Sequence, residues 1–398
     1  MKILHITPYF YPAWAYGGPP RAAYELCKEL VKRGHEVTVY TTDTLDAQKR
    51  VYVPSKEALE IDGIKVYYFK NLSNRLAGKY HLFITPTFVK ALRHNLKGFD
   101  VIQLYGARTT LHIPAHHYAK KYGVPYVLLT AGGISPFITK QGLKRLFDML
   151  FGYRILKDAA KVIAGNEVEI DEYKKMGVDE DKITLISPAY DVSSFSHPPI
   201  FGQFRKRFSI KEKHIILFLG RIAKIKGIDF LVESFHELAQ ERDDVALVIA
   251  GPDDGHQAAL ESLVRKLDLS TRVLFTGFLD GEDKLSALVE ATMLVQTSIY
   301  ERGPGSPFEA ILCNTPIIVT KDTGCGDIVA EVDAGYLVQY GNVNELKNMM
   351  RKVLDDPTEA RDKMQRAKEY IMANLSYEKI VEEYERLYES VILSRRGG

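Results

Sequence analysis

The 398-residue sequence predicts two doubly wound α/β domains that face each other across a cleft. Three observations predict this fold. Short apolar runs of strand length alternate with stretches of helical period, which is typical of a parallel sheet covered on both faces. The chain is too long for one ordinary core, because single cores stop growing at about 250–300 residues. Finally, each half opens with the same order of strand, loop and helix.

The first half begins with a predicted strand, KILHIT, and a loop that contains Gly17 and Gly18. A helix is expected over about residues 22–33, because its apolar side chains recur at helical spacing and Gly34 follows as a terminator. The strand EVTVYTT completes a βαβ unit. Further strands are predicted at DVIQLYG and VPYVLLTAGG, with a helix through HHYAKKYG between them.

The second half repeats this order. HIILFLG is predicted as a strand, GRIAKIKG as a loop, GIDFLVESFHELAQER as a helix and DVALVIAG as a strand, and RVLFTG and MLVQTS follow as strands with helices between them. The interval HPPIFGQFRKRFSIKEK is interpreted as a linker because of its Pro, Gly and charge content. We therefore expect a Rossmann-like domain over 1–195, joined by an amphipathic C-terminal helix over 376–398, and a second Rossmann-like domain over 196–375.

Composition indicates a folded protein, with 46% hydrophobic and 26% charged residues. No apolar run approaches the ~18 residues of a membrane span, and the apolar N-terminal segment is short and broken by Pro8. We therefore expect a cytoplasmic protein. The three cysteines, Cys27, Cys313 and Cys325, lack the spacing of a metal site, which favours free thiols over disulfides or structural zinc.

Charge is unevenly distributed along the chain. The net charge is +2, yet residues 1–161 hold 24 Lys and Arg against 11 Asp and Glu. This excess indicates an anionic partner, such as a lipid headgroup, a charged saccharide or a phosphate, or else a solvated basic surface. Residues 144–161 mix basic and large apolar side chains, so they form either a peripheral contact with the inner face of an anionic membrane or a core helix with a basic rim. The D-x-D pattern at 179–181 is interpreted as a solvated turn.

Candidate site residues follow the predicted strands of the second half, where ligands of open α/β sheets bind. Arg221 and Lys226 flank the start of a helix, which suits a diphosphate, although a basic loop can also be merely solvated. Glu301 and Glu309 lie on either side of a loop rich in glycine and proline. These carboxylates could accept hydrogen bonds from vicinal hydroxyls, act as an acid and base on a glycosidic bond, or serve only as a cap and a surface residue.

Three quoted segments carry a family resemblance. The succession GRIAKIKG, IAGPDDG and VLFTGFLDGEDKLSALVEATMLVQTSIYERGPGSPFEAILCNTPIIVT resembles the family 4 glycosyltransferases, which are retaining sugar-nucleotide transferases of the GT-B fold. The similarity continues through GCGDIVAEVDAGYLV and SYEKIVEEYERLY, and in the first half it includes the Gly17 and Gly18 loop. It therefore covers nearly the whole chain.

The resemblance implies catalytic roles for three residues. Arg221 and Lys226 match the basic pair that contacts the donor diphosphate, and Glu301 matches the glutamate that holds hydroxyls of the transferred sugar. Retention in this family is ascribed to same-face attack, in which the leaving phosphate takes the acceptor proton. The resemblance thus implies a metal-independent hexosyltransferase with no cofactor.

The resemblance also implies a set of donor-binding residues. Glu309 matches the residue that binds the ribose hydroxyls. The other matching positions cradle the diphosphate through the backbone or seat the nucleobase; they are Gly17, Gly18, Phe278, Leu279, Gly305 and Ser306. The expected partners are a UDP- or GDP-linked sugar and a saccharide or lipid-linked acceptor, with no nucleic acid.

The sequence departs from the family pattern at several positions. Residues 302–305 are Arg-Gly-Pro-Gly where the family has Gly-Phe-Gly after its first glutamate, and Asn314 replaces a glycine at the end of a predicted helix. Asn tolerates the left-handed conformation that such a position requires. At the linker, residues 188–192 read Pro-Ala-Tyr-Asp-Val in place of the common Pro-Asn-Gly-Val-Asp. Residues 130–133 lack a histidine that is frequent there, and we expect the histidines at 112, 116 and 117 to have core or surface roles.

The expected function is transfer of a sugar from a nucleotide donor to a hydroxyl. A sugar-nucleotide epimerase on the same fold is the alternative. An NAD-dependent dehydrogenase is disfavoured, because neither half has G-x-G-x-x-G after its first strand.

Overall fold

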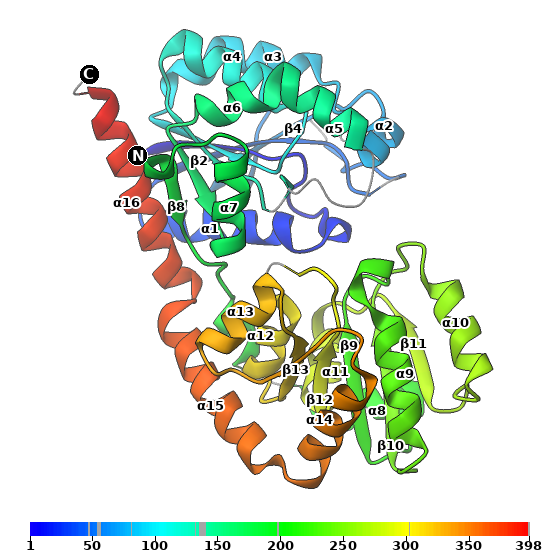
Figure 1. Cartoon of the computed structure of the whole chain (residues 1–398). Helices are drawn as coiled ribbons and strands as arrows, with labels where there is room; N and C mark the ends of the chain where they lie inside the picture. Colours follow the sequence, from blue (N-terminus) through cyan, green and yellow to red (C-terminus); the bar gives the residue numbers. More distant parts are fainter. Residues whose placement is uncertain are drawn as a thin grey trace. The chain divides into compact units, whose positions relative to one another are not determined.

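The computed structural model describes residues 1–46, 48–53, 57–80, 82–131, 133–134, 141–196, 199–301 and 303–396. The chain divides into two compact units, each built around one sheet (Figure 1). Unit 1 comprises residues 1–189 and the C-terminal segment that begins at Tyr377, and unit 2 comprises Tyr190–Ser376. The sequence-based division at residue 195 lies slightly beyond the observed one at Ala189.

Unit 1 contains an eight-stranded sheet in the order β3-β4-β2-β1-β5-β6-β7-β8. The strands are β1 (Lys2–Ile6), β2 (Glu36–Thr42), β3 (Leu59–Ile61), β4 (Ile64–Phe69), β5 (Val101–Tyr105), β6 (Tyr126–Leu129), β7 (Lys161–Ala164) and β8 (Ile183–Leu185). All pairs are parallel except the edge pair β3 and β4. The strand order reverses between β1 and β5, which makes this the switch point of a doubly wound sheet.

Helices cover both faces of the unit 1 sheet (Figure 1). They include α1 (Gly18–Lys32), α2 (Asn74–Tyr80), α3 (Pro86–Asn95), α4 (His112–Tyr122), α5 (Gln141–Phe147), α6 (Tyr153–Lys157), α7 (Glu167–Lys175) and α16 (Tyr377–Arg396). On β5, Ile102 and Leu104 join the apolar core beneath α3 and α4. Gln103 points to the opposite face, where it accepts a hydrogen bond from Tyr388 of α16 at 3.0 Å.

The C-terminal helix α16 buries the stripe expected from its period. Ile380, Tyr384, Leu387 and Val391 are all buried. The helix packs on α1 and β5, so its apolar stripe completes the core of unit 1.

Unit 2 contains a six-stranded, fully parallel sheet in the order β11-β10-β9-β12-β13-β14. The strands are β9 (His214–Leu219), β10 (Val245–Ala250), β11 (Val273–Gly277), β12 (Met293–Gln296), β13 (Ile317–Thr320) and β14 (Tyr336–Val338). This is the strand order of a dinucleotide-binding doubly wound sheet, with its switch point between β9 and β12. The prediction of two doubly wound, Rossmann-like sheets is confirmed.

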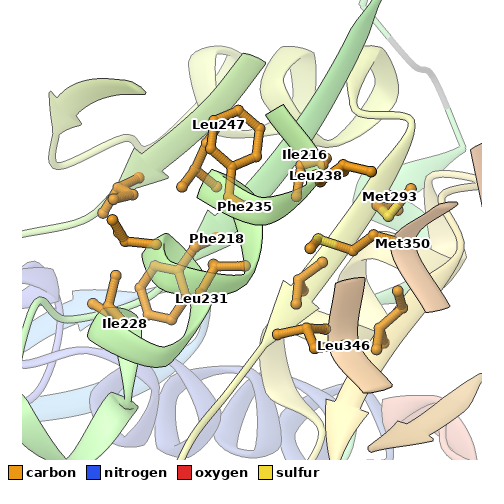
Figure 2. Packing of buried hydrophobic residues seen from close by; sticks show 14 of the residues in the cluster. Ile216, Phe218, Ile228, Leu231, Phe235, Leu238, Leu247, Met293, Leu346 and Met350 are labelled. Atoms are coloured by element: carbon orange, nitrogen blue, oxygen red, sulfur yellow. The ribbon is translucent and has the colours of Figure 1, made fainter. Parts of the chain in front are cut away.

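The core of unit 2 fixes β9 against two helices of one face. The helices of this unit are α8 (Gln203–Phe208), α9 (Ile228–Ala239), α10 (Gln257–Lys266), α11 (Gly281–Glu290), α12 (Gly305–Leu312), α13 (Gly324–Glu331), α14 (Val343–Asp355) and α15 (Pro357–Asn374). Figure 2 shows Phe218 of β9 and Phe235 of α9 packed with Leu346 and Met350 of α14. Because every one of these side chains is buried, the end of β9 is a rigid platform for the loop that follows it.

The predicted linker is wrong for part of its length. Residues 203–208 form α8, which packs on α11 of unit 2. Phe204 is buried, and the N–H groups of Phe204 and Arg205 donate to the Glu290 carboxylate at 2.8 and 3.0 Å. A carboxylate that accepts hydrogen bonds from the first turn of a helix stabilises that helix. This contact favours a helix in a stretch whose composition is typical of a linker. His197 and Pro198 lie outside the described residues.

The three cysteines are free, and Cys27 and Cys325 are buried, as the prediction of free thiols requires. Burial holds the pKa of both buried thiols well above the ordinary range. Within the described residues, no helix combines the length and apolar character needed to cross a bilayer.

Candidate active site

The loops that follow β9 and β12 meet at the switch point of unit 2. Gly227 has φ +58°, and a Cβ added there would lie 2.2 Å from the carbonyl oxygen of Thr297. Only glycine fits this close approach. The Ile299 N–H donates to the Ile225 carbonyl at 2.9 Å, and the Thr297 hydroxyl donates to the Lys226 carbonyl at 3.3 Å. The two loops therefore hold a fixed register.

Lys226 and Glu301 form an ion pair across this switch point. Their side chains are 14% and 19% exposed, so both charges are largely removed from solvent. Glu301 Oε2 also accepts hydrogen bonds from Gln296 Nε2 at 2.7 Å and from the Ser298 hydroxyl at 3.2 Å. Three donors thus fix this carboxylate at the carboxyl end of β12, and each charge offsets the desolvation of the other.

Arg221 lies on the same loop as Lys226 but in a more open position. Its side chain is 62% exposed and pairs with Asp254, which is 51% exposed and follows β10. The two loops approach closely, because a Cβ on Gly251 would lie 1.8 Å from the Gly220 carbonyl oxygen. An exposed ion pair of this kind contributes only about 0–1 kcal/mol, so an anionic ligand can replace Asp254 at little cost.

The helix α12 carries three of the predicted residues. It begins at Gly305, whose N–H donates to the Gly303 carbonyl at 3.0 Å. The Ser306 hydroxyl donates to the Leu219 carbonyl at 2.8 Å, which ties the start of α12 to the end of β9. Glu309, one turn further, pairs with Lys284 of α11 at 2.9 Å. The structure therefore places Ser306 beside the switch point and Glu309 against the neighbouring helix.

Gln296 is a site residue that the sequence analysis missed. It is the last residue of β12 and is buried. Its Nε2 donates to Glu301, and its Oε1 lies 3.1 Å from the Ser306 hydroxyl, so one side chain connects Glu301 to the start of α12. The available signal was a polar residue at the end of an otherwise apolar strand, MLVQ. Lys284, the partner of Glu309, was also missed, and nothing in its local sequence distinguishes it from a surface lysine.

Phe278 and Leu279 follow β11 and differ in exposure. Phe278 is 57% exposed, whereas Leu279 is 5% exposed. The ring of Phe278 is thus available to a ligand, while the side chain of Leu279 belongs to the interior. Since β10 separates β11 from β9, this position lies to one side of the Lys226 and Glu301 pair along the sheet edge.

Gly17 and Gly18 belong to unit 1, in the loop after β1. Gly17 has φ +87°, and both glycines are exposed, with open space where a Cβ would project. Gly17 caps α1, and Gly18 is the first residue of that helix. A role of these residues in the site of unit 2 stays a prediction.

The histidines of unit 1 have the core and surface positions that were expected. His112 is buried, and its Nε2 lies 3.1 Å from the Tyr105 carbonyl oxygen. Burial lowers the pKa of His112 to about 4 and that of His5 to about 3. His116 pairs with Asp158 at 2.8 Å, and His117 is exposed.

Some of the positions that depart from the family pattern lie within the described residues. Arg302 and Gly132 lie outside the described residues. Pro304 is buried at the start of α12. Asn314 follows α12 with φ +63°, which confirms the left-handed conformation expected for the residue that replaces glycine.

Among the described parts of the chain, no cluster of three or more His, Cys, Asp or Glu could hold a metal ion. The acidic segment at 179–181 is an exposed turn, as predicted, in which Glu180 pairs with Lys174 at 2.9 Å.

Relatives of known identity extend over most of the chain. N-acetyl-alpha-D-glucosaminyl L-malate synthase of Bacillus anthracis is 23% identical and is matched over 96% of this chain and 96% of its own length. D-inositol 3-phosphate glycosyltransferase of Kineococcus radiotolerans is 24% identical over 89% of this chain and 86% of its own length. Among solved structures, the fold is similar to Anabaena Alr3699/HepE in complex with UDP and glucose, with a TM-score of 0.78, 19% identity and coverage of 98% and 100%.

Two family profiles match the chain. The profile of Glycosyltransferase Family 4 matches residues 16–194, and that of Glycosyl transferases group 1 matches residues 201–370. Together they span both units, and the fold neighbours are glycosyltransferases of the GT-B fold. The chain therefore belongs to the family 4 glycosyltransferases and is a glycosyltransferase.

Proposed function

We propose that this glycosyltransferase moves a hexosyl group, with retention of configuration and without a metal ion, from a UDP- or GDP-linked sugar to a hydroxyl of a saccharide or lipid-linked acceptor. The observation that carries the proposal is the Lys226 and Glu301 pair at the switch point of unit 2. Ligands of doubly wound sheets bind at such a point. The similar fold of the Anabaena protein, crystallised with UDP and glucose, supports a nucleotide-sugar donor.

Two cations would stabilise the leaving group. Cleavage of the bond between sugar and phosphate develops negative charge on the diphosphate, so fixed positive charge there stabilises the transition state more than the ground state. Lys226 supplies this charge from a position held by the loop contacts of Gly227 and Thr297. Arg221 would exchange Asp254 for phosphate oxygens, which a guanidinium can bind in bidentate fashion.

Two carboxylates would hold the donor at its two ends. Glu301, fixed by Gln296 and Ser298, would accept hydrogen bonds from hydroxyls of the transferred sugar. Glu309 would bind the ribose hydroxyls from a position oriented by Lys284. Since ribose is distant from the reacting carbon, its contacts contribute equally to the ground state and the transition state.

The remaining donor contacts would come from backbone groups and one ring. The first turn of α12 would offer the backbone N–H of Ser306, and that of Gly305 in exchange for its Gly303 carbonyl partner, where a helix N-terminus favours phosphate. The exposed ring of Phe278 would stack on the nucleobase, and the backbone of Leu279 would bind the base edge. Gly17 and Gly18 would allow the backbone of unit 1 to approach the diphosphate.

Retention would follow from attack on the face that the leaving group departs from. The acceptor oxygen bonds to the anomeric carbon as the bond from that carbon to the phosphate oxygen breaks. The acceptor proton passes to the departing phosphate oxygen, so no side chain acts as a nucleophile. The role of the protein is then to position the donor and to neutralise developing charge.

Product analysis tests the proposal. We expect nucleoside diphosphate to be released in step with a glycoside, only when acceptor is present, and with the anomeric configuration of the donor in the proton NMR spectrum. Inverted product would contradict retention. A new nucleotide sugar formed without acceptor would replace the proposal with an epimerase, and an activity abolished by EDTA and restored by a divalent cation would contradict metal independence.

A further inference from the structure

An unusual surface of unit 1 lies on the continuous helix formed by residues 141–157. This helix consists of α5, a wider π-helical turn over Asp148–Gly152, and α6. Six large apolar side chains on it are between 37% and 66% exposed; they are Leu143, Leu146, Met149, Leu150, Phe151 and Tyr153. Single exposed apolar residues are ordinary, but six on one short helix are a concentration of exposed apolar surface of the kind that marks an interaction site. We refer to these six side chains and the basic residues beside them as the outer face.

The exposed apolar side chains are densest on the π-helical turn. Three consecutive side chains of this turn are exposed, Met149, Leu150 and Phe151. Asp148 and Gly152 stay buried on the inner side, where a Cβ on Gly152 would lie 2.7 Å from Asp148 Oδ1. Such turns are rare inside helices and recur at functional sites.

The charge of the outer face has a single sign. Arg145, Arg154 and Lys157 are exposed between or beside the apolar side chains. Asp148, the one acidic residue of 141–157, points inward and forms a bidentate pair with Arg108 at 2.9 and 2.8 Å. The outer face therefore presents cations and apolar groups without a compensating carboxylate of its own helix.

The neighbouring helix α4 extends the basic surface. A shallow pocket of about 540 Å³ lies between the two helices, and Leu150 and Phe151 form part of its apolar wall. The rim of the pocket is basic, with Lys120, Lys121 and Arg154. Lys120 is partly neutralised by Asp158 at 2.8 Å. The combination of an apolar wall with a basic rim suits a phosphate group attached to an apolar chain.

We propose that the outer face docks unit 1 onto an anionic lipid bilayer. The apolar side chains enter the boundary between headgroups and acyl chains, and the basic side chains contact lipid phosphates. The excess of 24 basic over 11 acidic residues in 1–161 adds long-range attraction to the same surface. A second copy of the chain is a poorer occupant, because a two-fold interface places a patch against itself and would bring like charges together.

Vesicle co-sedimentation of the full chain tests this proposal. We expect the protein to sediment with phosphatidylcholine vesicles that contain 30% phosphatidylglycerol and to remain in solution with phosphatidylcholine alone. Raising the salt concentration should weaken binding, because surface charges are screened. The assay contains no nucleotide, so its outcome is independent of the donor proposal.

Two double variants locate the contact. M149D/L150D removes apolar insertion, and R145E/R154E reverses two cations. Each is expected to weaken vesicle binding at least tenfold, since one basic residue at an anionic surface contributes about fivefold.

Matched controls distinguish an effect of the outer face from the effect of changing charge or apolar surface anywhere on the protein. R75E/K90E makes the same charge change elsewhere in unit 1, and I200D/F201D replaces two exposed apolar residues of unit 2. Both controls should stay within about threefold of the unmodified chain. Thermal unfolding of every variant reports whether it is folded.

Three results would overturn the proposal. One is that the unmodified chain fails to sediment with anionic vesicles. Another is that the outer-face variants bind as well as their matched controls. A third is that M149D/L150D converts a dimer to a monomer in sedimentation velocity while lipid binding stays absent, which would assign the patch to a second copy.

Discussion

The loops at the two switch points share a topology and differ in chemistry. In unit 2 the loops after β9 and β12 bring opposite charges together, Lys226 and Glu301. In unit 1 the loop after β1 is aromatic: the rings of Tyr9 and Tyr16 stack with centroids 3.6 Å apart, and the rings of Tyr11 and Trp14 pack against α1. The buried histidines near β1 and β5 are held neutral by their low pKa values. The loops after β9 and β12 of unit 2 are therefore joined by an ion pair, whereas the loop after β1 of unit 1 packs through aromatic rings.

The glycines of the two regions differ in the same way. Gly227 and Gly251 are required by close backbone contacts, so the loops of unit 2 have one available path. Gly17 has a positive φ but open space around it. Preorganised charge is what a reaction with a developing diphosphate charge needs, because rearrangement during the reaction would reduce the stabilisation. This contrast is consistent with the proposal that unit 2 holds the reacting diphosphate.

Substitution of these glycines should give the largest effect and tests the contrast directly. Gly227→Ala forces a Cβ against the Thr297 carbonyl in a left-handed conformation, and we expect it to destabilise unit 2 by about 3 kcal/mol or more. Gly17→Ala meets no close contact and carries only the strain of its own backbone, with φ +87° and ψ −147°, so it should destabilise unit 1 by about 1–3 kcal/mol. Chemical denaturation of both variants measures the difference. Equal losses of unfolding free energy in the two variants would show that the close approach of Gly227 to the Thr297 carbonyl does not distinguish the two regions.

Removal of the two carboxylates should have the next largest effect. Glu301→Ala is expected to lower kcat about 100-fold, as loss of one preorganised contact does, with a smaller change in donor KM. Glu309→Ala is expected to raise donor KM about tenfold and to leave kcat nearly unchanged, because a ribose contact is uniform binding. Initial rates over a range of donor concentrations separate the two patterns. A reversal of these patterns would contradict the assignment of sugar and ribose contacts.

Acid stability should distinguish unit 1 through its buried histidines. The folded-state pKa of His112 is about 4, below the unfolded value of about 6.5, so the unfolded state binds more protons as the pH falls through 6.5. The contribution of neutral His112 to the free energy of unfolding is complete above pH 6.5 and is lost progressively as the pH falls toward 4. His112→Gln keeps a donor for the Tyr105 carbonyl. It should reduce the loss of unfolding free energy between pH 7.5 and pH 5.5 by about 1.4 kcal/mol.

The control for this prediction is His117→Gln, which replaces an exposed histidine of the same helix. It provides the comparison for replacement of a histidine outside the core. Denaturant unfolding at the two pH values, followed by a probe in unit 1, measures both variants. If His112→Gln retained the full pH dependence of the unmodified chain, the buried neutral imidazole would not be its source.

The smallest effect is expected at the exposed pair of unit 2. Asp254→Asn removes the partner of Arg221 and should change the free energy of unfolding by less than about 1 kcal/mol. It should lower donor KM by up to about fivefold, because Arg221 no longer exchanges a carboxylate for phosphate. A raised KM would show that Asp254 orients Arg221 toward the donor instead of competing with it.

The fold and part of the site could be predicted from the sequence. Buried apolar runs, such as HIILFLG, identify their strands. Residues in the loops that follow these strands, such as Lys226 and Glu301, lie toward the carboxyl edge of a parallel sheet. Contacts between distant segments could not be predicted. Gln296 acquires its role only when α12 packs against β9, and α8 forms because Glu290 caps it from 85 residues away.

The orientation of residues 141–157 also required the structure. Their composition fits both a core helix with a basic rim and a membrane surface. Which side chains face outward depends on the π-helical turn and on the pairing of Asp148 with Arg108, and neither follows from the period of the sequence.

Nucleoside diphosphate binding to two lysine variants tests the central claim most directly. Lys226 and Lys224 lie on the same short turn, but Lys224 is exposed, whereas Lys226 pairs with Glu301. Calorimetric titration with UDP or GDP, whichever stabilises the chain, should show Lys226→Gln binding at least about tenfold more weakly than the unmodified chain, as expected for loss of a charge-assisted contact. Lys224→Gln should bind within about twofold of it. Equal affinity of both variants and the unmodified chain would contradict a diphosphate site at the β9 and β12 switch point.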